Sequence, residues 1–114
     1  MSKIKAERAG SEIQRELGNI LLLEAKDVDF KNVTITAVEV SNDLSFAKVY
    51  FTTTDDREHV IHDLNNAAGF FRSLLAERVE MRHTPELRFI FDESIEYGEK
   101  IEKIIKELHK EDWL

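Results

Sequence analysis

The stretch NNAAGFFR, residues 65–72, interrupts a segment that otherwise has the pattern of one continuous helix. Apolar residues step by three or four along that segment, at Ile61, Leu64, Ala68, Phe71, Leu75 and Val79. This spacing is typical of an amphipathic helix. Gly69 lies inside the pattern, although glycine costs a helix about 1 kcal/mol relative to alanine. Either a kink between two helices or the close approach of another segment favours a glycine at such a position.

A β-hairpin is predicted upstream of this segment. Residues 33–40 are rich in β-branched side chains, and their alternation shifts phase near Ala37 and Val38, which indicates a bulge or burial of both faces. SNDLS at 41–45 has the side chains of a turn. The strand after the turn places Ala47, Val49 and Phe51 on one face and Phe46, Lys48 and Tyr50 on the other.

The chain is predicted to begin with a helix, from about Ile4 to Ala25. Its apolar stripe consists of Ala6, Ala9, Ile13, Leu17, Ile20 and Leu21. Gly10 and Gly18 are unhelpful to a helix, and each can allow another backbone to approach closely.

The remaining elements follow from capping and turn residues. Thr54 or Asp55 is expected to cap the central helical region, and Pro85 ends it. Residues 86–92 predict a third strand, and Ser94 is the expected N-cap of a final helix at about 94–110.

The order α-β-β-α-α-β-α predicts an α+β fold, with a three-stranded sheet covered by helices on one face. At 114 residues the chain is long enough for one core, so we expect a single domain over residues 1–114. There is no cysteine, no apolar run long enough to span a bilayer and no apolar signal core. A cytoplasmic monomer without a membrane partner is therefore expected.

Catalytic chemistry has no visible apparatus in the sequence. His59, His62 and Asp63 could in principle hold a metal, but no third ligand lies at a recognisable spacing. Glu16, Asp92 and Glu93 could be acid/base carboxylates, but nothing in the sequence indicates that two of them lie together in a pocket. We expect no enzyme activity, no metal and no cofactor.

The basic residues are the candidates for binding. The net charge of −7 argues against a nucleic-acid partner, but residues 92–112 hold eight acids against four lysines, so the remainder of the chain is less acidic. The candidate RNA-binding or subunit-binding residues are Lys3, Lys5, Arg8, Arg15, Lys48, Arg72, Arg78, Arg82 and Arg88. Acids are interleaved with several of them, so a mixed solvated surface is the alternative. Phe70, off the apolar stripe, could stack on a base or pack on a neighbouring helix.

Two helical segments that meet at a glycine between a hairpin and a third strand resemble the K-homology RNA-binding fold of type II. That fold has a G-x-x-G loop between its helices, which this chain lacks. RAGSEIQRELGNIL, VEVSNDLSFAKVYF, LNNAAGFFRSLL and MRHTPELRFIFDESIEYGEKIEKII together resemble the ribosome-binding factor A family. In that family an Ala-x-Gly kink replaces the loop, which assigns Ala67, Ala68 and Gly69 to an interhelical kink.

The resemblance implies a non-catalytic factor of ribosome biogenesis. It would bind the free small ribosomal subunit and its ribosomal RNA late in maturation, near the decoding region, and would support adaptation to cold. An assembly GTPase is a second partner to consider. The alternative from another class is a K-homology-like adaptor that binds protein instead of RNA, using the last helix.

Overall fold

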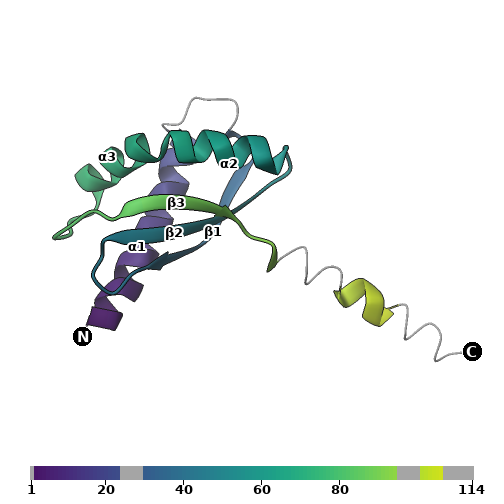
Figure 1. Ribbon diagram of the computed structural model, residues 1–114, viewed down its shortest axis with the longest axis horizontal. Helices are drawn as coiled ribbons and strands as arrows, with labels where there is room; N and C mark the ends of the chain where they lie inside the picture. Colours follow the sequence, from purple (N-terminus) through teal and green to yellow (C-terminus); the bar gives the residue numbers. More distant parts are fainter. Residues whose placement is uncertain (1, 24–29, 95–100, 107–114) are drawn as a thin grey trace, which may run out of the picture.

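The computed structural model describes residues 2–23, 30–94 and 101–106, and in it helices cover one face of a small sheet (Figure 1). The elements are α1 (Ser2–Leu23), β1 (Val33–Val40), β2 (Phe46–Thr53), α2 (Arg57–Asn66), α3 (Ala68–Arg78) and β3 (Glu86–Phe91). The predicted fold class and element order are confirmed. Of the final helix, Ser94 and residues 101–106 are helical, and the remainder of 94–110 lies outside the described residues.

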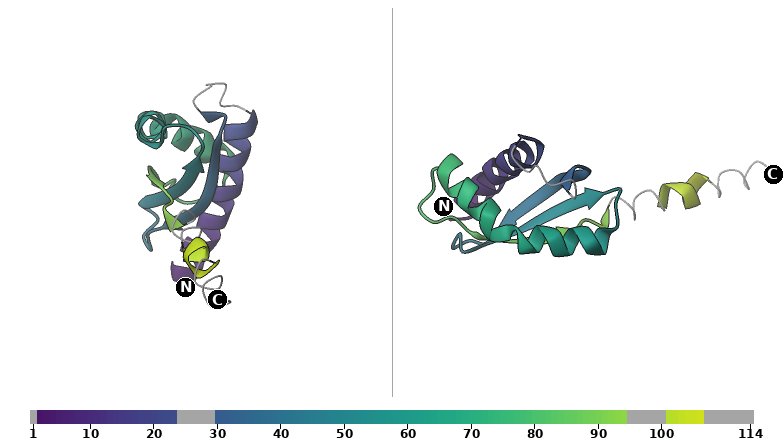
Figure 2. Two further views of the ribbon diagram at one scale, coloured as in Figure 1. Left: turned by 90° about the vertical axis from the view of Figure 1, so that its right-hand side faces the viewer. Right: turned by 90° about the horizontal axis from the view of Figure 1, so that it is seen from above.

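The sheet has the order β1-β2-β3, with β2 in the centre. β1 and β2 pair antiparallel, as a hairpin must, whereas β2 and β3 pair parallel. A parallel pair needs a crossover connection, which α2 and α3 supply. In Figure 1, α1 lies behind the sheet, and α2 and α3 run along its β3 side; the views of Figure 2 agree.

The predicted bulge in β1 lies between Ile35 and Ala37, one position earlier than the phase shift indicated. Thr36 is the extra residue, and it is held from two sides. Gln14 Nε2 in α1 donates to the Thr36 carbonyl at 3.2 Å, and the Thr36 hydroxyl donates to Asp92 Oδ2 at 2.6 Å. Beyond the bulge, Val38 packs against the core again.

The core lies between the helices and the inner face of the sheet. Its largest fully buried side chains are Phe51, Phe71, Phe89, Ile13, Leu17, Ile20, Leu64 and Leu75. These come from every element of the predicted stripes, since α1, the hairpin, both central helices and β3 each contribute. The ring of Phe71 meets those of Phe30 and Phe89 edge-on, with centroids 5.7 Å apart in both pairs. Phe71, in the first turn of α3, therefore packs among rings from other parts of the core.

The turn at residues 41–45 is built on Asp43. Its carboxylate accepts from Ser41 Oγ at 2.7 Å, Ser45 Oγ at 2.6 Å and Ser45 N at 3.1 Å. These hydrogen bonds lower the pKa of Asp43 from 3.8 to about 2. Leu44 has a φ of 61°, which the turn requires of it.

The cap of α2 differs from the prediction. α2 is capped by Asp56, whose side chain accepts from Glu58 N at 3.3 Å, and not by Thr54 or Asp55. Asp55 instead accepts from the amide of Asn32. At the start of the last helix, Asp92 Oδ1 accepts from Ser94 N at 2.9 Å. The residues that Ser94 is expected to cap lie outside the described residues, so that cap stays a prediction.

The glycines of the helices have different surroundings. Gly69 lies within α3 and has no positive φ, and among the described residues a Cβ there would meet nothing within 4 Å. Within the described part of the chain, no atom therefore comes close enough to Gly69 or Gly18 to require a glycine there. Close packing does explain Gly10, where a Cβ would lie 2.8 Å from the carbonyl oxygen of Val38. The helix break itself is at Ala67, which has φ −91° and ψ 3° and ends α2.

Candidate nucleic-acid groove

A groove of about 540 Å³ separates the α2–α3 junction from β3. The helices contribute Asn65, Ala68, Gly69 and Arg72, and β3 contributes residues 86–90. Four residues of the stretch NNAAGFFR thus form one wall. At Gly69 that wall is bare backbone, so the groove is accessible directly beside the helix break.

β3 is an edge strand, and its free edge faces this groove. Glu86 N and Asp92 N donate to Ser45 O and Phe51 O on the β2 side, at 2.9 and 2.7 Å. Since successive residues of a strand direct their backbone groups to opposite edges, Leu87 and Phe89 direct theirs toward the groove.

Asn65 closes the β3 edge at one position. Its Nδ2 donates to the Phe89 carbonyl at 3.1 Å, and its Oδ1 accepts from Phe89 N at 2.9 Å. The amide side chain thereby replaces a neighbouring strand and ties the end of α2 to β3. Sequence reasoning missed this residue, because its partner lies 24 positions away and asparagine before a helix break has many other uses. Two residues earlier in β3, the backbone of Leu87 borders the open groove.

Arg72 lies at the mouth of the groove and is part-buried, unlike the solvated arginine that a mixed surface would have. Its Nε and Nη2 both donate to the Thr84 carbonyl, at 3.1 and 2.9 Å. A carbonyl binds the guanidinium without neutralising its charge. Arg88 lines the same groove from β3 and is exposed. In the described part of the chain neither arginine has an ion pair, although Glu86 also lines the groove.

Three other predicted residues gather in a second hollow of about 560 Å³. Lys5 and Arg8 of α1 line it together with Arg82, which follows α3, and with residues of the turn at 41–45. Arg8 is paired with Glu12, at 3.9 Å between Nε and Oε1. Glu80 and Asp43 also line this hollow, so its charge is mixed.

Arg15 and Arg78 converge on Glu16. Arg15 Nε lies 3.9 Å from Glu16 Oε1, and Arg78 Nη1 lies 3.7 Å from Glu16 Oε2. The Arg78 side chain is only 28% exposed, so it joins α3 to α1 and is not a freely solvated charge. Lys48 is exposed on β2 beside Arg88, and Lys3 lies in α1 with a side chain outside the described residues. The nine predicted residues therefore fall on several surfaces.

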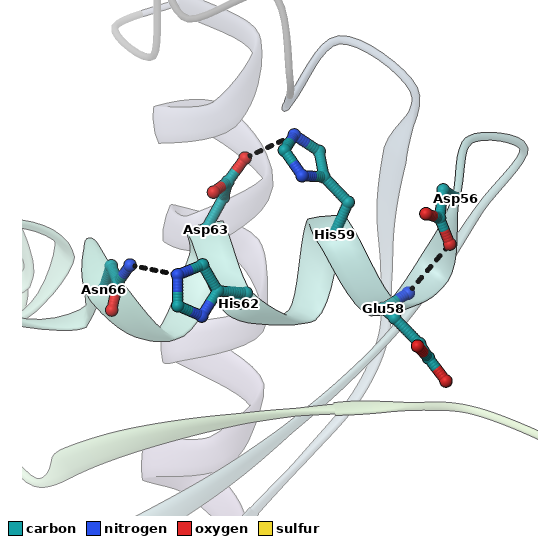
Figure 3. A network of polar contacts seen from close by, with 6 residues as sticks. All are labelled: Asp56, Glu58, His59, His62, Asp63 and Asn66. Carbon is teal, nitrogen blue, oxygen red and sulfur yellow. Dashed lines mark hydrogen bonds and ion pairs between the residues drawn. The ribbon is translucent and has the colours of Figure 1, made fainter.

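The histidines of α2 are each directed to a separate partner one turn further on (Figure 3). His59 Nε2 lies 3.1 Å from Asp63 Oδ2, and His62 Nε2 lies 3.0 Å from Asn66 Nδ2. Within residues 2–23, 30–94 and 101–106, no group of three metal-ligating side chains is arranged to hold an ion. Over the same ranges no helix is both long and apolar enough to cross a membrane.

Phe70 packs on Phe71, its neighbour in α3, with centroids 5.7 Å apart, and stays 53% exposed. A more exposed ring lies elsewhere, at Phe46 on β2, with 59% of its surface free. The strand alternation already placed Phe46 on the polar face, which is the signal that could have singled it out.

Comparisons with known proteins agree on one family. A family model described as ribosome-binding factor A matches residues 5–105. The ribosome-binding factor A of Staphylococcus carnosus is 47% identical over 115 aligned positions, covering 98% of this chain and 100% of the relative. The crystal structure of ribosome-binding factor A from Thermus thermophilus is 27% identical, with a TM-score of 0.69 over 75% of this chain and 93% of that one.

A second set of coordinates of the Thermus thermophilus protein, a homology model fitted into the cryo-EM map of its 30S complex, has 27% identity and a TM-score of 0.64. It covers 74% of this chain and 91% of that one. The family model and the relatives span nearly all of the sequence, and the fold is the one seen in the solved structures. This chain therefore belongs to the ribosome-binding factor A family.

Proposed function

We propose that this chain is a non-catalytic assembly factor that binds the small ribosomal subunit through its ribosomal RNA. The family supports this, as does the 30S complex of the Thermus thermophilus relative. We extend the proposal to late maturation of the free subunit, to growth in the cold, and to a monomeric, single-domain protein in the cytoplasm. An assembly GTPase that acts on the same subunit fits such a role.

The observation that carries the RNA-binding proposal is the groove beside β3. Arg72 and Arg88 supply two positive charges there without an acidic partner in the described residues. A phosphate backbone is the ligand that neutralises such a pair, and the release of its counterions contributes to binding. The backbone N–H and C=O of Leu87 offer a donor and an acceptor to a base edge in the same groove. Charge and hydrogen-bonding groups are therefore matched to nucleic acid, although the whole chain is acidic.

The alternative function, a protein-binding adaptor, is favoured by one observation. In the segment 101–106, Ile101, Ile104 and Ile105 are 38%, 46% and 48% exposed. An apolar helix face of this kind is suited to a protein partner. Replacing Ile104 and Ile105 with glutamine separates the two functions, because it should leave RNA-dependent binding of the subunit intact.

The proposal is tested by co-sedimentation of the purified protein with small subunits over a potassium chloride series. Wild-type affinity should fall steeply with salt. Arg88→Gln should weaken binding and flatten the slope of log K against log salt by about 0.7 to 0.9 for one lost phosphate contact. Lys31→Gln is the matched control, since Lys31 is an exposed cation that lines none of the described hollows. Equal binding by Arg88→Gln across the series would reject the groove, and absence of co-sedimentation by the wild type would reject the function.

A further inference from the structure

The outer face of the sheet has no helix over it in the described residues (Figure 1). On this face lies a third hollow of about 400 Å³. It lies on the paired strands β2 and β3 and is lined by Phe46, Ala47, Lys48, Glu86, Leu87 and Arg88. Side chains alternate along a strand, so Phe46 and Lys48 project outward from β2 while Glu86 and Arg88 do so from β3. An exposed aromatic ring therefore lies beside two cations over a shallow depression.

The two cations are direct neighbours. Lys48 and Arg88 are partners in the parallel register of β2 and β3, whose backbones are about 4.8 Å apart. Neither has an ion pair in the part of the chain that the structure describes. Glu39, opposite Lys48 on β1, instead accepts a hydrogen bond from the Tyr50 hydroxyl at 3.4 Å. Like charges side by side on a sheet repel each other, and a bound anion would remove that repulsion.

The hollow shares part of its lining with the groove on the other side of β3. Glu86, Leu87 and Arg88 line both, so β3 forms the ridge between them. A strand of RNA that leaves the groove over Arg88 would reach Lys48 and then Phe46.

We propose that the outer face of β2 and β3 is a stacking platform for single-stranded RNA. One base stacks on the ring of Phe46, and the adjacent phosphates bind Lys48 and Arg88. This rests on the proposed function and extends the RNA path beyond the groove. An acidic peptide would neutralise the two cations equally well, but it gives no reason for the ring of Phe46 to stay 59% exposed beside them. A nucleic-acid base does, because every base has a face that stacks on an aromatic ring.

The experiment uses the full chain and a short single-stranded RNA that contains aminopurine, an adenine analogue whose fluorescence is quenched by stacking. Wild type should bind and quench it. Phe46→Leu should weaken binding about tenfold, the loss of one base stack, and should abolish the quenching, while Phe46→Trp restores both. Phe70→Leu is the matched control, since Phe70 is a similarly exposed phenylalanine outside the hollow. Circular dichroism and thermal melting would verify that each variant is folded.

The cationic pair is tested in the same assay. Lys48→Ala combined with Arg88→Ala should flatten the salt dependence by about 1.4, at 0.7 for each single-strand phosphate contact. Quenching that persists in Phe46→Leu, or that is lost equally in Phe70→Leu, would overturn the platform. So would displacement of the RNA by polyglutamate of matched charge as efficiently as by unlabelled RNA, because the face would then be a general anion-binding or protein-binding surface.

Failure of the platform and failure of the proposed function give different results. If wild type co-sediments with small subunits but quenches aminopurine in no single-stranded RNA, the platform is wrong and subunit binding stands. If wild type does not co-sediment, subunit binding itself is wrong, and the platform falls with it as a part of that function.

Discussion

Replacing Gly10 with alanine should destabilise the protein, although alanine is the better helix former. α1 crosses β1 so closely at this position that the added Cβ would lie 2.8 Å from the Val38 carbonyl oxygen and 3.7 Å from Val40 Cγ2. The first contact is with backbone and cannot be relieved by a side-chain rotation. Either α1 or β1 must move, and α1 is fixed by Ile13 and Leu17, both fully buried.

The size of the effect follows from two opposing contributions. Helix propensity favours alanine by about 1 kcal/mol. Forcing an extra methyl group into a packed interface costs about 1 to 3 kcal/mol, and the short contact with backbone places Gly10 toward the upper end. We expect a net loss of about 1 to 2 kcal/mol in the free energy of unfolding, which in a domain of this size lowers Tm by roughly 5 to 10 °C.

Urea denaturation followed by far-ultraviolet circular dichroism, which reports helix content, measures this directly. Gly18→Ala is the internal control, because Gly18 is in the same helix and a Cβ there would meet no atom of the described residues within 4 Å. It should stabilise the protein by up to about 1 kcal/mol. Gly69→Ala should behave like Gly18→Ala, because the backbone at Gly69 is helical and open. If Gly10→Ala were as stable as Gly18→Ala, the close approach of α1 to β1 would be refuted.

Two further predictions concern polar side chains. Asn65→Ala should lower the free energy of unfolding by about 1 to 3 kcal/mol, because the Phe89 N–H and C=O lose their partner. Asn66→Ala, one position along, is the control. Equal effects of the two substitutions in urea denaturation would argue against the stabilising role of the hydrogen bonds between Asn65 and Phe89. The lowered pKa of Asp43, about 2 against 3.8, means that its contribution to stability is fully present above the unfolded value and is lost as the pH falls through the folded value. The difference in stability between wild type and Asp43→Asn should therefore be constant at neutral pH and shrink between pH 3.8 and about 2, and a difference that stays constant over that window would contradict the assignment.

The sequence predicted the features that depend on local periodicity. The apolar stripe of α1 and the alternation of β2 led to the core residues correctly, since each pattern repeats within a few residues. The predicted cap of α2 was wrong because Thr54, Asp55 and Asp56 are all good capping residues. In the structure Asp55 instead accepts a hydrogen bond from Asn32, which leaves Asp56 as the cap. That bond joins residues 23 positions apart, so it has no local signal.

The candidate site was harder to predict for the same reason. Arg72 was identified as a candidate binding cation, but its two hydrogen bonds to the Thr84 carbonyl depend on the path of the chain after α3. Gly69 in NNAAGFFR was explained by a kink or by a close approach, and the helix break lies two residues earlier, at Ala67, with no close neighbour of Gly69 among the described residues. Gly10, whose neighbour Val38 comes from another element, is the glycine that the fold requires. Long-range contacts of this kind appear only when the elements are assembled.

The two edge strands of the sheet, β1 and β3, are where the protein could pair with other molecules and aggregate. An exposed strand edge is a template for strands of other molecules. Along β1, α1 lies against the Val38 carbonyl, and Gln14 occupies the Thr36 carbonyl. Along β3, Asn65 occupies both backbone groups of Phe89. A second copy of this chain thus finds no continuous row of free backbone groups on these stretches, whereas the backbone of Leu87 stays open to a small ligand in the groove. Asn65, which lines the groove, therefore also shields part of the β3 edge from pairing with a strand of another molecule.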